Sequence, residues 1–369
     1  MENREWVNIK LGEALTFQRG HDLPKSQMIE GNYQVAGSNG TIGFHNVYTT
    51  KGPGITIGRS GNIGTPHYYK DNFWAHNTVL YVKDFKGNSE LFLYYFLKNI
   101  DFSSFNTGSA VPSLNRNHIH EYEIQLPPLP EQKAIASVLS SLDDKIDLLH
   151  QQNQTLEALA ETLFRQWFIE EAKEDWEEGI LDDILSVKGG TTPSTNNPSF
   201  WNGNIHWTTP RDITTLNGIY LFDTERKITE LGLSKISSGL LPKGTLLMTS
   251  RAPVGVLAFT EVPIAINQGY IAILDNKQYS KEFIYLWLKC NIDYVHSFSN
   301  GSTFMEISKS AFKSLKIQKP PVHLTEKFQK IIEPIFIKLK LNSKQIQTLT
   351  QLRDTLLPKL MSGEVRVQL

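Results

Sequence analysis

The sequence predicts an α+β protein in which two similar mixed α/β domains, related by a pseudo-twofold axis, are separated by an antiparallel two-helix coiled coil. Three observations support this fold class: an internal repeat, two long heptad patterns, and opposite net charges on the two heptad segments. The repeat is clearest where Thr155–Phe164 aligns with Thr348–Leu357 at a shift of 193 residues. A period of this length indicates two structural halves.

The repeat extends through most of each half. The segment FLYYFLK, which starts at Phe92, aligns with FIYLWLK, which starts at Phe283, at a shift of 191 residues. Near the beginning of each half, Trp6 aligns with Trp176 at a shift of 170 residues. The shift is steady late in each half and drifts early, which is expected for similar domains whose N-terminal portions differ in length.

Apolar residues recur every seven positions in the two aligned segments, which predicts two long coiled-coil helices. The expected seam residues are Ile135, Leu142, Leu149, Leu156 and Leu163 in the first helix and Phe328, Ile335, Asn342, Leu349 and Leu356 in the second. Intervening seam positions are expected at Val138, Leu159, Ile331 and Leu352. Asn342 is either a polar residue tolerated near a kink at Pro334 or a residue that specifies helix register.

The two predicted helices differ in charge. Residues 131–178 contain 4 Lys/Arg and 12 Asp/Glu, a net of −8, whereas residues 321–369 contain 8 and 4, a net of +4. Because both seams must be buried, opposite charge favours pairing of the two helices with each other over pairing of either with a second copy. Eight residues join the first helix to Trp176 and eight follow the second helix, so the termini occupy equivalent places in a cycle, and we expect Glu364–Gln368 to pack beside residues 5–12. The expected divisions are globular domains at 1–129 and 171–321, helices at 130–170 and 322–363, and a tail at 364–369.

Composition limits the remaining possibilities. The net charge is −1, hydrophobic residues make up 40% and charged residues 20%, as in soluble globular proteins. A single cysteine, Cys290, excludes a disulfide framework and suits a reducing cytoplasm. The longest apolar run, Leu91–Leu97, is too short to span a bilayer, so no membrane partner is expected. No metal site is expected, since only His118 and His120 lie close together in the sequence.

Short apolar runs in both globular segments predict strands, and each set is followed by a short apolar helix. The expected strands are Gly54–Gly58, Val79–Val82, Thr245–Thr249, Val254–Phe259 and Tyr270–Leu274, and the expected helices are Glu90–Lys98 and Glu282–Lys289. Clusters of Gly, Pro, Asn and Ser separate these elements and predict loops rich in polar side chains.

The polar loops supply the candidate DNA-binding residues. They are Arg59, Ser60, Asn62, His76, Asn77, Ser109, Asn115, Arg116, Lys188, Thr209, Arg211, Arg251, Asn267, Gln268 and Ser302. Arg, Asn and Gln side chains can each form two hydrogen bonds with one base edge. Asn, Gly and Ser are also ordinary turn residues, so the composition of the loops fits both DNA binding and simple turn formation.

No catalytic residues are expected in this chain. Asn197–Phe200 (NPSF) lacks the second proline of the Asn-Pro-Pro-aromatic motif of amino-methyltransferases. No glycine-rich strand-turn-helix motif accompanies it to hold a cofactor, and no Walker A motif is present. The sequence therefore predicts a protein that binds rather than one that catalyses.

Three sets of residues resemble the DNA-specificity subunit of type I restriction-modification systems. The first is LPPLPEQKAIA at Leu126–Ala136 with LFRQWF at Leu163–Phe168, and the second is LRDTLLPKLMSGE at Leu352–Glu364. The third is a variable domain before each helix, opened by a Trp and closed by a Gly-Ser turn at Gly108-Ser109 or Gly301-Ser302. The second proline block, at Pro320–Glu326, lacks the Leu-Pro-Glu-Gln of the first.

The resemblance implies a non-catalytic subunit that reads a bipartite, asymmetric target in double-stranded DNA, with one target-recognition domain for each half-site. Two modification (methyltransferase) subunits would bind this scaffold and methylate adenines with S-adenosylmethionine held on those subunits, so no cofactor is expected on this chain. Restriction subunits would complete the complex. Because the chain has little positive charge to neutralise phosphates, we expect the isolated subunit to bind DNA weakly.

The alternative is a coiled-coil scaffold whose globular domains bind protein partners and no DNA. Substitution of Arg59 or Arg251 distinguishes the two: loss of modification with intact assembly supports DNA contact, and lost assembly with intact modification supports the scaffold.

Overall fold

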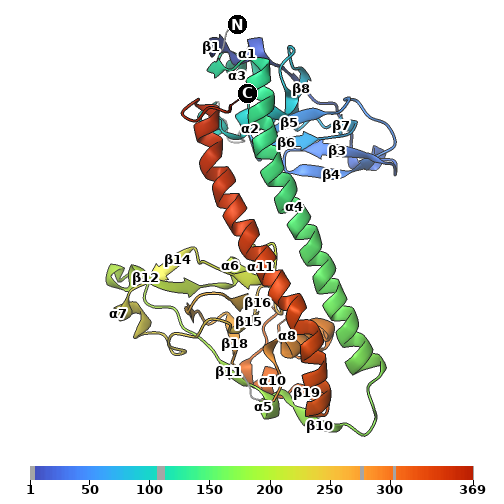
Figure 1. The fold of residues 1–369 in the computed structure, drawn as a ribbon, viewed down its shortest axis with the longest axis vertical. Coiled ribbons are helices and arrows are strands. Elements are labelled where there is room, and N and C mark those ends of the chain that lie inside the picture. Colours follow the sequence, from blue (N-terminus) through green and yellow to red (C-terminus); the bar gives the residue numbers. More distant parts are fainter. Residues whose placement is uncertain (1–4, 106–112, 275–277, 302–304, 369) are drawn as a thin grey trace. The chain divides into compact units, whose positions relative to one another are not determined.

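The computed structural model describes residues 5–105, 113–274, 278–301 and 305–368. The chain forms two compact units. Unit 1 combines the chain up to Lys145 with the chain from Leu349 onward, and unit 2 runs from Ile146 to Thr348. Each unit therefore contains one globular domain together with a segment of both long helices (Figure 1).

The globular part of unit 1 contains two sheets and a short strand pair. An antiparallel sheet has the order β2-β8-β5-β6, a smaller mixed sheet has the order β4-β3-β7, and β1 pairs with β9. The strands are β1 (Val7–Lys10), β2 (Thr16–Arg19), β3 (Tyr33–Gly37), β4 (Gly40–His45), β5 (Gly54–Gly58), β6 (Pro66–Tyr69), β7 (Phe73–Ala75), β8 (Val79–Asp84) and β9 (Glu123–Leu126). The helices are α1 (Leu11–Ala14), η1 (Lys25–Gln27), α2 (Glu90–Lys98), η2 (Phe102–Phe105) and α3 (Arg116–His120).

Unit 2 repeats this arrangement with additions. Its sheets have the orders β11-β18-β15-β16-β13 and β14-β12-β17, and β10 pairs with β19. The strands are β10 (Glu177–Ile180), β11 (Ser186–Lys188), β12 (Trp201–Thr208), β13 (Tyr220–Leu221), β14 (Arg226–Ile228), β15 (Leu246–Thr249), β16 (Leu257–Thr260), β17 (Ile264–Ile266), β18 (Tyr270–Leu274) and β19 (Lys316–Lys319). The helices are α5 (Leu181–Ile184), η4 (Pro198–Phe200), α6 (Pro210–Thr214), α7 (Glu230–Leu233), α8 (Lys281–Cys290), α9 (Ile292–Ser297) and α10 (Lys309–Lys313).

Local sequence explains the apolar helix of each domain. The hydroxyl of Ser89 accepts a hydrogen bond from the Phe92 amide at 3.3 Å and caps α2, and the hydroxyl of Ser280 accepts one from the Phe283 amide at 3.1 Å and caps α8. Serine is favoured at this position because its oxygen satisfies an amide that has no partner within the helix. The apolar residues that follow each cap are largely buried in the domain core.

One predicted strand was too long. The run Val254–Phe259 was expected to be extended throughout, but β16 begins only at Leu257. The preceding Gly255 has φ +90° and its amide donates to the Thr249 carbonyl at 2.9 Å, which closes a turn after β15. A positive φ is accessible to glycine and ends the extended conformation.

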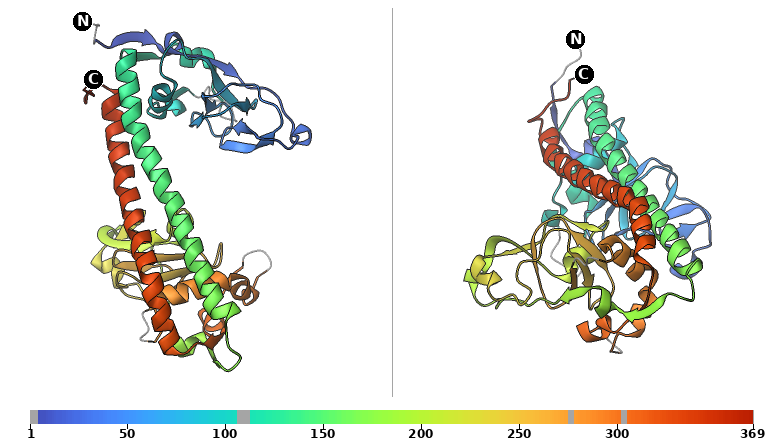
Figure 2. Two further views of the ribbon diagram at one scale, coloured as in Figure 1. Left: turned by 45° about the vertical axis from the view of Figure 1, so that its right-hand side comes forward. Right: turned by 60° about the horizontal axis from the view of Figure 1, so that its bottom comes forward.

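Two long helices supply segments to both units. Helix α4 spans Leu129–Arg165 and continues into the π-helical turn η3 (Gln166–Glu170), and α11 spans Val322–Met361 without a break at Pro334 or Pro358. Within each unit the α11 segment lies beside the α4 segment (Figure 2).

Side-chain contacts establish the direction of pairing. In unit 1, Arg353 Nη1 donates to Asp143 Oδ1 at 2.7 Å. In unit 2, Asn342 Nδ2 donates to Asn153 Oδ1 at 3.0 Å. Further along the same helix pair, the rings of Phe164 and Phe328 lie 5.9 Å apart between centroids. Residues later in α4 contact residues earlier in α11, so the two helices pair antiparallel, as predicted. The Asp143–Arg353 pair also agrees with the opposite charges of the two segments.

The ten predicted seam residues are all buried or half-buried, but three intervening positions were wrong. Leu159, Ile331 and Leu352 are exposed at 46%, 41% and 45%. The buried residues that follow the predicted seam positions lie four positions later, not three, as Leu139 follows Ile135. Because an α-helix advances 3.6 residues per turn, steps of three and four both fit one face, and the sequence pattern alone did not fix their order.

The interior of the helix pair in unit 2 contains two asparagines. Asn153 and Asn342 are 4% and 1% exposed. Besides their mutual hydrogen bond, Asn153 Nδ2 donates to Ser343 Oγ at 3.3 Å. Among the described residues nothing donates to Asn342 Oδ1. The polar contact is satisfied only when these two positions face each other, which favours a role in specifying register.

We expect Asn342→Leu to lower the free energy of unfolding by about 1–3 kcal/mol, because it leaves the buried Asn153 Oδ1 without the donor that Asn342 supplies. The double variant Asn153→Leu/Asn342→Leu should recover most of this loss, since it replaces both polar groups with apolar ones. Urea unfolding of the four proteins in the double-mutant cycle measures the coupling. Two losses that simply add would contradict a role for the pair.

Candidate nucleic-acid interface

In unit 1 the predicted residues gather at one end of the main sheet, where β5 ends and β8 begins. The Arg59 amide donates to the Thr78 carbonyl at 2.8 Å, and Arg59 Nε donates to the Asn77 carbonyl at 3.2 Å. These bonds hold the loop after β5 against the loop before β8. We call this end, with residues 59–65, 76–78 and the start of α3, the unit 1 edge.

Helix α3 joins the unit 1 edge through the residues just before it. The Leu114 amide donates to the Arg59 carbonyl at 2.9 Å, and Ser60 forms a β-bridge with Ser113. Asn115 caps α3 by accepting a hydrogen bond from the Asn117 amide at 3.0 Å. Arg116, the first residue of α3, is exposed. Candidates from three separate parts of the sequence therefore lie close together.

Close backbone packing shapes the loop after β5. A Cβ at Gly58 would lie 1.8 Å from the Asn62 carbonyl oxygen, so only glycine fits. The Gly64 amide donates to the Gly58 carbonyl at 2.8 Å and closes the loop. Asn62 is left exposed at its tip.

Two polar side chains at the unit 1 edge have side-chain partners. His76 Nδ1 lies 3.0 Å from Thr78 Oγ1. Asn77 Nδ2 donates to the carboxylate of Asp22, which also forms an ion pair with Arg19 at 3.4 Å. Asn77 is half-buried and Asp22 is exposed. Of the remaining candidates in this unit, Ser109 lies outside the described residues.

Unit 2 presents the same arrangement at the matching end of its main sheet, where β15 ends and β18 begins. The Ser250 amide donates to the Gly269 carbonyl at 2.8 Å, and the Ile307 amide donates to the Ser250 carbonyl at 3.0 Å. Arg251 forms a β-bridge with Glu306. We call this end, with residues 250–256, 267–269 and the start of α10, the unit 2 edge. Ser302 lies outside the described residues.

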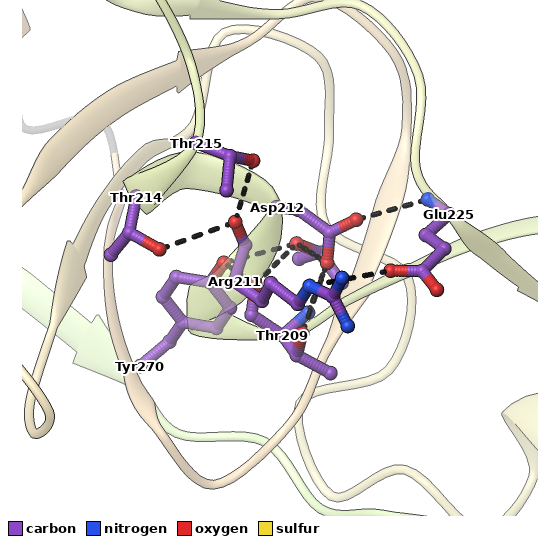
Figure 3. Close-up of polar contacts among 8 residues, drawn as sticks. Thr209, Arg211, Asp212, Thr214, Thr215, Glu225 and Tyr270 are labelled. Atoms are coloured by element: carbon purple, nitrogen blue, oxygen red, sulfur yellow. Dashed lines mark hydrogen bonds and ion pairs between the residues drawn. The ribbon is translucent and has the colours of Figure 1, made fainter. Parts of the chain in front are cut away.

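The second sheet of unit 2 brings Thr209 to the same edge, because β12 and β17 run parallel and end together. The Asn267 amide donates to the Thr208 carbonyl at 3.1 Å. Thr209 is the N-cap residue of α6, and its amide donates to Asp212 Oδ2 at 2.7 Å in a capping box (Figure 3). Arg211 is exposed, with Nε 4.0 Å from the Glu225 carboxylate.

The Tyr270 side chain holds the residues just before α6 in place. Its hydroxyl lies 3.0 Å from Thr208 Oγ1 and donates to the Thr209 carbonyl (Figure 3). Burial raises the pKa of Tyr270, so the hydroxyl stays protonated and remains a donor. The start of α6 is thereby fixed to the start of β18 and is not a free loop.

The polar residues at and near the unit 2 edge differ in whether their side chains are exposed and free to contact a ligand. Asn267 is 8% exposed, and its amide oxygen accepts a hydrogen bond from the Gly269 amide at 2.8 Å, so it shapes the turn. Gln268 is exposed, and its Oε1 accepts a hydrogen bond from Thr192 Oγ1 at 2.7 Å. Lys188 ends β11, and its Nζ donates to the Ser238 carbonyl at 3.3 Å.

Some residues at the two edges were missed. Asp22 and Thr192 contact the candidate amides, and Lys309 begins α10. The internal repeat contained the signal for two of them: Lys309 follows Arg116 by 193 residues, and Thr192 follows Asp22 by 170. These are the same shifts that relate the late and early parts of the two halves.

Arg226 of β14 was also not among the candidates selected from the sequence. Its guanidinium lies over the ring of Trp201, 3.6 Å from the centroid, and it pairs across strands with Trp207. No acidic partner of Arg226 is found among the described residues. No local sequence pattern selects Arg226, since the pairing of β14 with β12 that brings it to these rings includes a register shift between Trp201 and Ile205.

Comparison with known proteins identifies the class to which this architecture belongs. A family model described as the type I restriction modification DNA specificity domain matches residues 3–158 and 173–351. The chain therefore belongs to the type I restriction-modification DNA specificity family. In the described part of the chain, no helix combines the length and the apolar character needed to cross a bilayer.

Individual relatives agree. The chain is similar to the type I restriction enzyme MjaIX specificity subunit of Methanocaldococcus jannaschii, 36% identical over 47% of this chain and 40% of that protein. It is similar to the HindI specificity subunit of Haemophilus influenzae, 24% identical over 69% of this chain and 71% of that protein. The chain thus spans well under half the length of the first relative.

A solved structure has the same fold. The crystal structure of the type I restriction-modification S subunit from M. genitalium superposes with a TM-score of 0.65 over 98% of this chain and 97% of that one, at 21% identity. This likeness confirms the predicted fold class. The individual DNA-binding residues stay predictions.

Proposed function

We propose that this chain reads DNA sequence for a type I restriction-modification complex, with unit 1 and unit 2 each reading one half of a bipartite target. The observation that carries the proposal is the repetition of one edge in both units. Arg59–Thr78 in unit 1 and Ser250–Gly269 in unit 2 are the same backbone contact, and both hold loops that carry an amide side chain, Asn77 or Gln268. Amide side chains can hydrogen-bond base edges in the major groove.

The chain acts in this proposal without catalysis. Methylation belongs to two modification subunits that bind the chain and hold S-adenosylmethionine, and restriction subunits complete the nuclease. The net charge of −1 supports a division of labour in which the other subunits supply much of the nonspecific attraction to phosphates.

The test is to map methylated adenines in DNA from cells that express the chain with its modification subunits. A two-part motif with an unread spacer is expected. Substituting Asn77 or Gln268 with alanine should change one half of the motif and leave the other half intact. A motif without two parts, or one in which both halves respond to each substitution, would contradict one half-site for each unit.

Equivalent cations at the two edges predict a salt effect. Arg116 and Lys309 are both exposed first residues of helices that follow the edge, and neither has an acidic partner among the described residues. We expect Arg116→Ala and Lys309→Ala each to lower the slope of log Kobs against log salt concentration by about one, because each cation neutralises one phosphate. Binding of target and unrelated DNA by the assembled complex should weaken by similar factors.

Lys70 provides the matched control for those two variants. It is exposed and directly follows β6, at the end of the sheet opposite the unit 1 edge. Lys70→Ala should leave the salt slope unchanged in titrations of the same complex. A slope that responds equally to all three variants would show that general charge, and not position at the edge, determines the effect.

A further inference from the structure

An amide side chain contacts a corresponding residue at both edges, but the amide donates a hydrogen bond in unit 1 and accepts one in unit 2. In unit 1 the amide of Asn77 contacts Asp22, and in unit 2 the amide of Gln268 contacts Thr192. The positions correspond: Gln268 follows Asn77 by 191 residues, as Gly269 follows Thr78 in the matched backbone contact, and Thr192 follows Asp22 by 170. One contact has therefore been retained in both halves while its hydrogen-bonding groups differ.

In unit 1 the contact fixes the orientation of the Asn77 amide. An ionised carboxylate only accepts hydrogen bonds. Asp22 is paired with Arg19 at 3.4 Å, so its partner must be the NH2 group of Asn77. The Asn77 carbonyl oxygen Oδ1 then faces away from Asp22, and no donor to it is found in the described part of the chain. The backbone of Asn77 is held separately, through Arg59 Nε.

In unit 2 the Gln268 amide is turned the other way. Thr192 Oγ1 donates to Gln268 Oε1 at 2.7 Å, so the contact uses the amide oxygen and not the NH2 group. Within the described ranges, no acceptor contacts that NH2 group. Gln268 is exposed, so its donors are accessible.

We infer that Asp22 and Thr192 are positioning residues that decide which hydrogen-bonding group each amide presents to DNA. The inference rests on the proposed function. Asn77 presents an acceptor and selects a base with an exocyclic amine, adenine or cytosine. Gln268 presents donors and selects a base with acceptors, which are the O6 and N7 of guanine, the O4 of thymine and the N7 of adenine, so it rejects cytosine.

The test changes the positioning residues and leaves the amides intact, in the complete modification complex, with the methylated motif as the readout. Asp22→Asn removes the obligate acceptor, so one position of one half-site should accept bases of both kinds. Thr192→Asp forces the Gln268 NH2 group inward and turns its oxygen outward, so one position of the other half-site should change from rejecting cytosine to requiring an exocyclic amine, adenine or cytosine. Discrimination at these positions should change about tenfold or more.

Two variants serve as matched controls. Asp71→Asn makes the same change at an exposed aspartate of unit 1, and Thr195→Asp adds the same charge three residues from Thr192 on the same loop. Both should keep the wild-type motif. Thr192→Val, which removes the hydroxyl without adding charge, should relax the same position that Thr192→Asp inverts, and it keeps the test open if Thr192→Asp fails to fold.

The outcomes separate this inference from the function on which it rests. If Asn77→Ala and Gln268→Ala alter the motif but Asp22→Asn and both Thr192 variants leave it unchanged, the positioning roles are overturned and the DNA-reading function stands. If none of these variants alters the motif, the inference is overturned as well. A wild-type complex that marks no bipartite motif would instead contradict the proposed function.

Discussion

Substituting Phe328 with alanine should lower the free energy of unfolding of unit 2 by about 3–5 kcal/mol, the usual cost of removing a buried aromatic ring. Phe328 in α11 is 1% exposed. Its ring lies 5.9 Å from that of Phe164 and 4.9 Å from that of Phe168, between centroids. Phe168 in turn lies 5.0 Å from Phe283 of α8. One ring therefore links the helix pair to the globular part of unit 2.

Urea unfolding monitored by tryptophan fluorescence measures this loss, and Ile337→Ala is the control. Ile337 lies on the same helix but is 51% exposed, so its truncation should change the unfolding free energy by only about 0.5 kcal/mol. Because alanine has a higher helix propensity than Phe or Ile, a similar loss for both variants could come only from lost side-chain contacts and would show that the aromatic cluster has no special weight. Loss of DNA modification by Phe328→Ala should follow from unfolding, with the motif unchanged in whatever activity remains.

Long-range sequence signals predicted most of the fold. The heptads and the repeat specified two helices and two related domains because each signal is summed over many residues. The positions Leu159 and Ile331 were wrong because a difference of one residue on a helix changes the facing direction by about 100°. The start of β16 was wrong because a single glycine, Gly255, adopts a positive φ that hydrophobicity does not reveal.

The candidate site was predictable in type but not in detail. Arg59, Asn77, Arg251 and Gln268 were selected because of their chemistry, and the structure places them at matching edges. Whether a side chain is available depends on neighbours that are distant in sequence: Asn267 bonds its own turn, whereas Gln268 next to it bonds Thr192, 76 residues away. Nothing in a local pattern distinguishes these two amides. Among sequence observations, a position-by-position comparison of the two halves comes closest to distinguishing them.

Substituting Arg366 with alanine should destabilise unit 1 by about 2–3 kcal/mol, because it leaves a buried carboxylate without its cation. Glu131 at the start of α4 is 2% exposed. Arg366 binds it through two hydrogen bonds, one from Nε to Oε1 and one from Nη2 to Oε2 at 2.7 Å, and Trp6 Nε1 donates to Oε2 at 3.2 Å. The side chain of Arg366 is 48% exposed, so water can partly replace it and the loss falls below that of a fully buried pair.

The double variant Glu131→Gln/Arg366→Ala distinguishes the buried charge from simple loss of contact. With the charge removed, much of the destabilisation should disappear in urea unfolding, whereas loss of packing over Trp6, where the guanidinium lies 5.7 Å from the ring centroid, would persist. Lys359→Ala breaks an exposed ion pair with Glu364 at 2.9 Å and should cost at most about 0.5 kcal/mol. If Arg366→Ala behaves like Lys359→Ala, the C-terminal segment is not held by Glu131, and its place beside Trp6 has another cause.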